Sequence, residues 1–558
     1  MKKVIFLLLM ILLSYTRLSG LTWSYPYPFH PDENNMVNSV QSLRCEGPSI
    51  KDCLNPHFFA YGQPPVYAAY IISKVMPMID HRLALRLISA FASILNAIVL
   101  IKMFQLFIKK KPQFSILIYI FLIVIFSPYF IQFSHFGTTE SILMFVYSLI
   151  TYFLLSWSKN DDFSYENVSL VGLSLGFAVA IKLSSLVFIL PFICVLIFSL
   201  LRRQSSKKIV LRIKTFLFQL ALLFIIGVLS YALFSPHNLI SWNDFMSSMK
   251  YEIGVGNGSL KVFYTQQFEG AQPVLFQLQH IFPYVLGLSQ YLLILFGLSA
   301  MVFRRTFQDK ILLLSILIYF VPVAFLYAKW TRFMSPIFPL LTVCALIGLH
   351  NAHDVLMKKF ENRAIIVHII SFVIVIITII PGIAHMSIYS QKDVRVEASE
   401  WIDKNIPQNS RIISEAGNVV DIPMNISQRF NIASFDFYNV DKSSSLKYDL
   451  QQYKNASQYI FVPSRRVFAD YTCMSPDKTY KQNISTNQCQ KLQKMYPILS
   501  RYYQEIFSEE GSFKHIKTFT SYPRISLLGK TLLEFPDEQA EETWTVFDHP
   551  VVRIYKKR

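Results

Sequence analysis

The amino-acid sequence predicts a mostly α-helical, polytopic membrane protein with about eleven transmembrane helices, followed by a small C-terminal α/β domain. Composition is the first reason. Only 16% of the 558 residues are charged and 53% are hydrophobic, whereas a soluble globular protein carries about a quarter charged residues. The mean hydropathy is +0.37. The second reason is that the apolar residues are gathered into runs of roughly the length that crosses a bilayer.

The apolar runs predict the order of the spans and their orientation. Most loops that would face the cytoplasm are rich in Lys and Arg, which is the positive-inside pattern. The first span then begins in the cytoplasm, and residues 24–81 and 235–283 form external loops. We expect a transmembrane module over residues 1–388 and an extracytoplasmic domain over residues 389–558. The expected spans are 4–23, 83–107, 114–133, 141–157, 170–183, 186–201, 216–234, 284–303, 311–327, 335–349 and 364–388.

The net charge of +18 does not indicate nucleic-acid binding. Much of the basic charge lies in short clusters between apolar runs, where it sets topology and contacts anionic lipid headgroups. Two of the six cysteines, Cys194 and Cys344, lie inside spans. The other four form two local pairs that are candidate disulfides if both regions face an oxidising compartment, with coincidence as the alternative. These pairs are Cys45 with Cys53 and Cys473 with Cys489.

The C-terminal region alternates short helical and strand patterns, which is typical of an α/β domain. It contains no phosphate loop, dinucleotide fingerprint, zinc spacing or Ser-His-Asp arrangement. The glycine-rich external loop 235–283 suits either a mobile cover over a site or a passive connection. The predicted C-terminal elements are helices over 398–405 and 491–507 and strands over 411–414, 459–462, 543–547 and 551–555.

The stretch Phe29-His30-Pro31-Asp32-Glu33 directly follows the first apolar run. Ionisable groups at the mouth of a span normally mark a functional site, because pairing or water access must offset their desolvation. We expect Asp32 to be a catalytic base. The structural alternative is that Pro31-Asp32-Glu33 simply begins a short surface helix, where acidic residues are favourable.

The predicted topology brings acids and bases from five parts of the sequence to the external side. Each has a structural explanation: Lys182 and Arg332 can extend their heads to the interface, and Glu140 can cap a helix. Their concentration on one face instead suggests an anion-binding pocket, formed by Lys182 and Arg332, beside a carboxylate cluster. The residues concerned are His30, Asp32, Glu33, Gln63, His135, Glu140, Lys182, Lys329 and Arg332.

Sugar transfer from a lipid phosphate fits such a pocket. The donor phosphate needs cationic partners, and the planar fork of Arg332 suits it. An acceptor hydroxyl attacks poorly unless a carboxylate such as Asp32 takes its proton. Direct attack with a single base inverts the anomeric centre. Glu33 and Glu140 could orient the acceptor, position Asp32 or hold a divalent cation.

The motifs and their order resemble those of the C-type (GT-C) membrane glycosyltransferases, in particular the protein O-mannosyltransferase and aminoarabinose transferase type. The resemblance covers roughly residues 1–390. The matching motifs are His30-Pro31-Asp32-Glu33, Tyr61-Gly62-Gln63-Pro64-Pro65, His135-Phe136-Gly137-Thr138-Thr139-Glu140, Ala180-Ile181-Lys182-Leu183-Ser184 and Arg332-Phe333-Met334-Ser335-Pro336.

The resemblance implies an inverting transferase of a prokaryotic plasma (inner) membrane that uses a polyprenyl-phosphate-linked sugar. Asp32 would be the base, Glu33 and Glu140 supporting acids, and Lys182 and Arg332 donor-phosphate ligands. His30, Gln63, His135 and Lys329 would support them. The loop after Ser235 has no recognisable β-trefoil insertion of the eukaryotic protein mannosyltransferases, so the acceptor stays open between glycan, lipid and protein.

A multi-pass transporter or lipid flippase with an external accessory domain is the alternative from another class. It predicts charges near the bilayer midplane and broken helices in paired repeats, whereas these charges cluster at one surface. No cofactor is indicated except the divalent cation that an Asp-Glu pair can bind.

Overall fold

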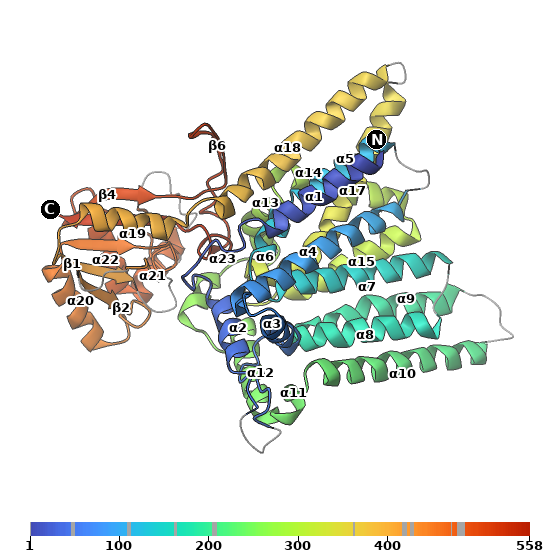
Figure 1. The fold of residues 1–558 in the computed structure, drawn as a ribbon, viewed down its shortest axis with the longest axis horizontal. Coiled ribbons are helices and arrows are strands. Elements are labelled where there is room, and N and C mark those ends of the chain that lie inside the picture. The colour runs from blue at the N-terminus through green and yellow to red at the C-terminus, as the bar shows by residue number, and fades with distance from the viewer. Residues whose placement is uncertain are drawn as a thin grey trace. The chain divides into compact units, whose positions relative to one another are not determined.

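The computed structural model describes residues 2–45, 51–108, 113–160, 164–202, 209–360, 363–415, 421–424, 429–469, 471–476 and 486–558 (Figure 1). The chain divides into two compact units. Unit 1 comprises Met1–Leu21, Asp32–Gly254 and Pro273–Ile383, and unit 2 comprises Thr22–Pro31, Val255–Gln272 and Ala384–Arg558. The segment that precedes Asp32 therefore belongs to unit 2, and Asp32 itself begins the next stretch of unit 1.

Unit 1 is helical throughout its described part (Figure 1). Its helices are α1 (Lys2–Leu18), α2 (Pro31–Gln41), α3 (Gln63–Val75), α4 (His81–Gln105), α5 (Phe114–Ile125), α6 (Pro128–Ser134), α7 (Glu140–Asn160), α8 (Tyr165–Ile181), α9 (Ile189–Arg202), α10 (Ile209–Phe234), α11 (His237–Ile240), α12 (Trp242–Asn257), α13 (Phe282–Val285), α14 (Leu288–Arg304), α15 (Phe307–Ala324), α16 (Thr331–Met334), α17 (Phe338–Lys359) and α18 (Ala364–Ser390).

Seven helical segments in the described chain are long and apolar enough to cross a membrane, and the chain is a multi-pass membrane protein. Two bent pairs raise the number to nine: α5 with α6, bent by 48°, and the segment Gln277–Val285 with α14, bent by 112°. The expected count of eleven is not confirmed. The shortfall arises where polar or short helices were counted as spans, namely at α1, which carries Lys2, Lys3 and Arg17, and at the 17-residue α8.

The spans differ in how deeply they are buried. In the span that contains α17, 89% of the most apolar window is buried inside the protein, against 17% for α10. A helix that is apolar all round must face either protein or lipid, so α17 is a central helix of unit 1 and α10 presents most of its surface outward. Helix α17 is preceded by Arg332, which places this side chain at the end of a central helix.

The stretch 24–81 contains the two short helices that the sequence predicts, α2 and α3. Their apolar residues pack against the start of α4, with Met36, Val37, Val66 and Leu85 in one buried cluster. Prolines at the first turn of α3 suit a helix start. The loop 235–283 contains the helices α11 and α12, and its two expected roles, mobile cover or passive connection, stay predictions.

Unit 2 contains a five-stranded sheet in the order β2-β1-β3-β7-β4. Strand β1 pairs in parallel with β2 and β3, and β7 pairs antiparallel with β3 and β4. The strands are β1 (Arg411–Glu415), β2 (Asn431–Phe435), β3 (Tyr459–Val462), β4 (Phe513–Phe519) and β7 (Val552–Lys557), while β5 (Arg524–Leu527) and β6 (Lys530–Glu534) form a separate hairpin.

Helices cover both faces of this sheet. Successive side chains of a strand point to opposite faces, so alternate residues of β3 meet different helices. Tyr459 and Phe461 of β3 pack with α19 (Val394–Asn405). Ile460 and Val462 pack on the other face with the helices α20 (Ser444–Ala456), α21 (Thr486–Met495) and α22 (Pro497–Phe507). Unit 2 is thus a three-layer α/β arrangement.

Two sequence predictions for unit 2 are wrong in detail. The helix expected over 491–507 is two helices, because Pro497 begins a new one. The strand expected over 543–547 is a helical turn, α23 (Glu542–Thr545), which begins where the side chain of Glu541 accepts a hydrogen bond from the backbone N–H of Thr543 at 3.1 Å. Thr, Trp and Val favour strands only weakly, and local capping outweighs them here.

The chain beyond α23 holds a buried charge network within unit 2. The Nδ1 of His549 lies 2.5 Å from Asp548 and its Nε2 lies 2.9 Å from Asp537, and Tyr389 donates a hydrogen bond to Asp548 at 2.6 Å. Burial lowers the pKa of His549, but the two carboxylates outweigh burial and raise it to about 10. The imidazole is therefore held as a cation between two acids.

Candidate functional site

Asp32 and Glu33 occupy the first turn of α2. Adjacent residues of an α-helix point about 100° apart, since the helix has 3.6 residues per turn. The two carboxylates therefore reach different partners, and the structure gives each of them its own arginine. One pair is sealed inside unit 1 and the other is open to solvent.

Glu33 forms the sealed pair. Its two oxygens accept hydrogen bonds from Arg86 of α4, from Nε at 2.6 Å and from Nη2 at 2.8 Å, and the side chains are 1% and 0% exposed. Arg86 also donates to the backbone carbonyl of Leu21 at 2.5 Å. This bidentate pair fixes α2 to α4. Sequence reasoning missed Arg86, although a charge inside the expected span 83–107 is itself a signal of a buried partner.

Asp32 forms the open pair with Arg332, which is 300 residues away in sequence. The two side chains remain 19% and 20% exposed. The guanidinium of Arg332 lies 4.7 Å from the ring centroid of Trp330 and 5.9 Å from that of Phe333. Stacking on aromatic rings holds a guanidinium in place without using its hydrogen-bond donors. Arg332 is thus positioned beside Asp32 with part of its surface accessible.

Lys182 and Glu140 form a second, looser pair next to the same aromatic ring. Their nitrogen and oxygen are 3.9 Å apart, with exposures of 19% for Lys182 and 4% for Glu140. The ammonium lies 5.1 Å from the ring centroid of Phe333. Both predicted cations therefore flank one phenylalanine. The Oε1 atom of Glu140 is buried without a hydrogen bond in the described chain, a situation that proteins usually avoid outside functional sites.

The turns that carry these side chains are packed directly against one another at two glycines. The backbone N–H of Gly62 donates to the carbonyl of Ile181 at 2.8 Å, and a Cβ at Gly62 would lie 2.0 Å from the carbonyl oxygen of Ala180. A Cβ at Gly137 would lie 2.9 Å from a carboxylate oxygen of Glu33. Only glycine permits such close approach. The segment that leads into Gln63 is therefore held beside the turn of Lys182. The segment that leads into Glu140 is held beside Glu33.

Two of the expected supporting residues serve mainly to join helices. Gln63 donates to the side chain of Asn238 at 2.8 Å and accepts from the backbone N–H of His237 at 3.2 Å. His135 is buried, with its ring nitrogens 2.7 Å from the carbonyl of Ile131 and 2.8 Å from that of Ser19. These contacts use the polar atoms of both side chains within unit 1.

The other two have contacts of a different kind. Lys329 donates to the carbonyl of Leu326 at 2.6 Å at the end of α15, and burial lowers its pKa. His30 belongs to unit 2, where its ring centroid lies 4.5 Å from that of Phe547. The supporting roles expected for these four residues stay predictions.

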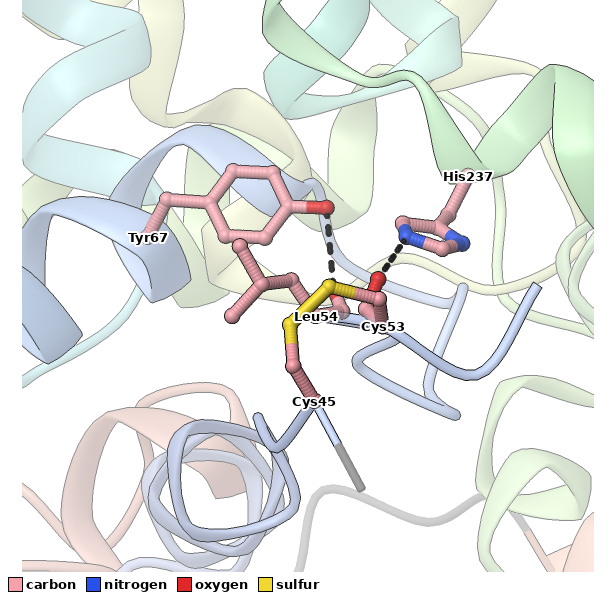
Figure 2. The surroundings of a disulfide bond; sticks show 5 residues. All are labelled: Cys45, Cys53, Leu54, Tyr67 and His237. Carbon is pink, nitrogen blue, oxygen red and sulfur yellow. Dashed lines mark hydrogen bonds between the residues drawn. A yellow bond between two sulfur atoms is a disulfide. The ribbon is translucent and has the colours of Figure 1, made fainter. Parts of the chain in front are cut away.

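Both expected cysteine pairs are disulfide-bonded, Cys45 to Cys53 and Cys473 to Cys489. Figure 2 shows how the first of them is anchored in unit 1. The carbonyl of Cys53 lies 2.9 Å from Nε2 of His237, and the carbonyl of the next residue, Leu54, accepts from the hydroxyl of Tyr67 at 3.2 Å. The disulfide thus ties the first external loop to α3 and α11.

Comparison with known proteins finds one matching family model. Residues 59–244 match the family model described as dolichyl-phosphate-mannose-protein mannosyltransferase. This stretch contains Gln63, Glu140 and Lys182, three of the residues singled out above. Over these residues the chain carries a domain of this membrane glycosyltransferase family. A comparison with curated protein sequences finds no significant match.

Solved structures similar to this chain include two that hold a lipid phosphate. Archaeal oligosaccharyltransferase AglB from Archaeoglobus fulgidus, in complex with an inhibitory peptide and a dolichol-phosphate, has a TM-score of 0.50 and 11% identity, over 82% of this chain and 69% of AglB. ArnT from Cupriavidus metallidurans, bound to undecaprenyl phosphate, has a TM-score of 0.48 and 13% identity, over 82% of this chain and 92% of ArnT. At such identity the likeness to AglB concerns the fold alone.

The site of the glycosyltransferase includes two side chains that the sequence analysis did not single out. Phe333 separates the two cations, and Glu252 of α12 interacts electrostatically with Lys182. Each could have been suspected, because one follows Arg332 directly and the other lies in the external loop 235–283. Within the described ranges, no group of three or more His, Cys, Asp or Glu side chains is placed to hold a metal ion. The carboxylates of Asp32 and Glu33 each face an arginine instead.

Proposed function

We propose that this glycosyltransferase moves a sugar from a polyprenyl-phosphate-linked donor to a hydroxyl acceptor on the outer face of a plasma (inner) membrane, with inversion at the anomeric carbon. The observation that carries the proposal is the open Asp32–Arg332 pair beside the loose Glu140–Lys182 pair. Together they offer a proton acceptor and two cations around one aromatic ring. Unit 2, including residues 389–558, would lie on the same outer side.

Asp32 is the proposed general base. An acceptor hydroxyl has a very high pKa, so a carboxylate must take its proton as the oxygen attacks the anomeric carbon. The new glycosidic C–O bond forms while the bond from the anomeric carbon to the phosphate oxygen breaks. The proton then resides on Asp32, and the polyprenyl phosphate leaves with the bonding electrons. Attack opposite to the leaving group produces inversion.

Arg332 and Lys182 are the proposed phosphate ligands. The negative charge that grows on the leaving phosphate is stabilised by preorganised cations, and a guanidinium can hold two phosphate oxygens at once. Arg332 pairs with Asp32. A bound phosphate would compete for the same guanidinium, so donor binding would free the Asp32 carboxylate for the acceptor. Glu140 holds Lys182 in place.

Glu33 is the proposed positioning acid. Its pair with Arg86 uses both carboxylate oxygens, so its contribution is to orient the first turn of α2 and thereby Asp32. The family match and the two lipid-phosphate complexes among the fold relatives support a lipid-phosphate donor. The acceptor is a glycan, a lipid or a protein.

The test is transfer by the purified chain in proteoliposomes supplied with a panel of radiolabelled polyprenyl-phosphate sugars and an envelope extract as acceptor source. We expect label to move from at least one lipid phosphate, and the product to carry the anomeric configuration opposite to that of the donor. Transfer from a soluble nucleotide sugar alone, or a product with the donor configuration, would contradict the proposal.

A further inference from the structure

Unit 2 contains a cleft of about 330 Å³ between α20 and α22. Nine side chains line it, and they include three cations and no carboxylate. The cations are Lys447 and Lys454 of α20 and Arg501 of α22. Concave sites with a few convergent polar groups are the usual form of ligand pockets, and this one is positively charged.

Two of the three cations have no internal partner. Lys447 and Arg501 are exposed, and among the described residues neither side chain makes a hydrogen bond, an ion pair or a ring contact. Lys454 differs, because it pairs with Glu505. Two like charges facing one cleft repel each other. An anion bound between Lys447 and Arg501 would relieve this repulsion.

Two tyrosines line the cleft and differ in exposure. Tyr448 is 66% exposed, so it presents an aromatic face to the cleft region. Tyr502 is only 3% exposed and belongs to the hydrophobic core of unit 2, and its hydroxyl is buried. A ligand in the cleft therefore meets Tyr448, and the buried hydroxyl of Tyr502 takes no part in binding.

We propose that the cleft between α20 and α22 binds an acidic sugar residue of a soluble or cell-surface glycan. The carboxylate or phosphate of the sugar would be held by Lys447 and Arg501. The apolar face of the sugar ring would lie on Tyr448, and its hydroxyls would meet the amide of Gln451. This inference does not depend on the proposed transfer reaction, because it concerns binding alone.

The test is binding of trigalacturonate to the full chain in nanodiscs of neutral lipid, measured by calorimetry, with maltotriose and inorganic phosphate as the neutral-sugar and bare-anion probes. We expect trigalacturonate to bind, and maltotriose to bind at least about tenfold more weakly, because it lacks the charge-assisted hydrogen bonds. Equal binding of both sugars, or no binding of trigalacturonate, would overturn the proposal.

Surface variants separate the contributions of charge and ring. The double variant K447E/R501E should weaken trigalacturonate binding by about tenfold or more, whereas K514E/K530E, an equal charge reversal at exposed lysines of β4 and β6, should leave it unchanged. Y448A should weaken binding of trigalacturonate but not of phosphate. If both double variants weaken binding equally, only general charge attraction is present. If Y448A changes the binding of neither trigalacturonate nor phosphate, the ligand is a bare anion. In either case the proposal fails.

Discussion

The two adjacent acids of α2 have opposite surroundings. Glu33 is closed off in a bidentate pair with Arg86, and both side chains are at most 1% exposed. Asp32 meets Arg332 in a pair that is about one-fifth exposed on each side. A sealed ion pair gives a substrate no access, while an open one can exchange its partner for a ligand. On this comparison we propose a structural role for Glu33 and a chemical role for Asp32.

The largest expected effect is on stability and comes from the sealed pair. R86M leaves the Glu33 carboxylate buried without its counter-charge, which costs about 3–5 kcal/mol. We therefore expect little folded R86M protein in detergent. The double variant E33L/R86M removes both charges and should recover much of the folded yield, since apolar replacement of a buried pair is often neutral.

Size-exclusion profiles and melting temperatures of the two variants check this prediction. A stable R86M variant would show that the Glu33–Arg86 pair is not structural, and the contrast with Asp32 would then disappear.

The next effect concerns donor binding at the open pair. R332Q should lower kcat/KM for the lipid-phosphate donor by about 100-fold, which is the usual loss when a transition-state donor group is removed. R332K keeps the charge but not the planar fork, so it should recover part of the activity. Initial rates at varied donor concentration measure both variants. Unchanged kcat/KM in R332Q would remove Arg332 from the phosphate site.

A smaller effect is expected at the looser pair. K182M should lower kcat/KM for the donor by about tenfold, because its ammonium is a single, mobile charge 3.9 Å from Glu140. K182R should retain more activity than K182M, and K74M, at an exposed lysine near the end of α3, serves as the matched control. Equal rates for K182M and K74M would argue that the Lys182 pair is structural, like that of Glu33.

The smallest expected effect is on the stability of unit 2, and it depends on pH. The folded-state pKa of His549, about 10, lies above its ordinary value of 6.5. The charged imidazole therefore stabilises the folded state fully below pH 6.5, and this stabilisation is lost as the pH rises through about 10. Protection of the β7 amides from hydrogen exchange, corrected for the intrinsic rate, should therefore fall between pH 7 and pH 10. D548N should reduce this alkaline loss and D449N should not. A flat profile in the native chain would contradict the charged imidazole.

Much of the fold follows from local patterns in the sequence. Hydrophobic runs predicted the helices, prolines and acids predicted the starts of α2 and α3, and short spacing predicted both cysteine pairs. The strands β2 and β4 were missed because their exposed, polar residues lack an apolar alternation. The span count was uncertain where charged or bent helices cannot be told from true spans by composition.

The site was predictable only as far as topology carries information. Asp32 and Arg332 are 300 residues apart, and the alternating direction of the spans was enough to bring both to one side. The pairing of each acid with its base could not be predicted, because it depends on the rotation of each helix about its axis. The pairing of Arg86 with Glu33 was missed for this reason, although the charge of Arg86 inside an expected span was a signal in itself.

The most direct test of the account is the D32N variant, assayed for sugar transfer and for thermal stability in the same preparation, with D52N in the same loop as control. We expect D32N to keep the elution profile of the native protein and a melting temperature within a few degrees of it, because the Asp32–Arg332 pair is partly exposed. Its transfer rate should fall by about 10²- to 10⁴-fold, the usual contribution of a general base, while D52N retains the native rate. Native-level transfer by folded D32N would contradict the assignment of Asp32 as the base.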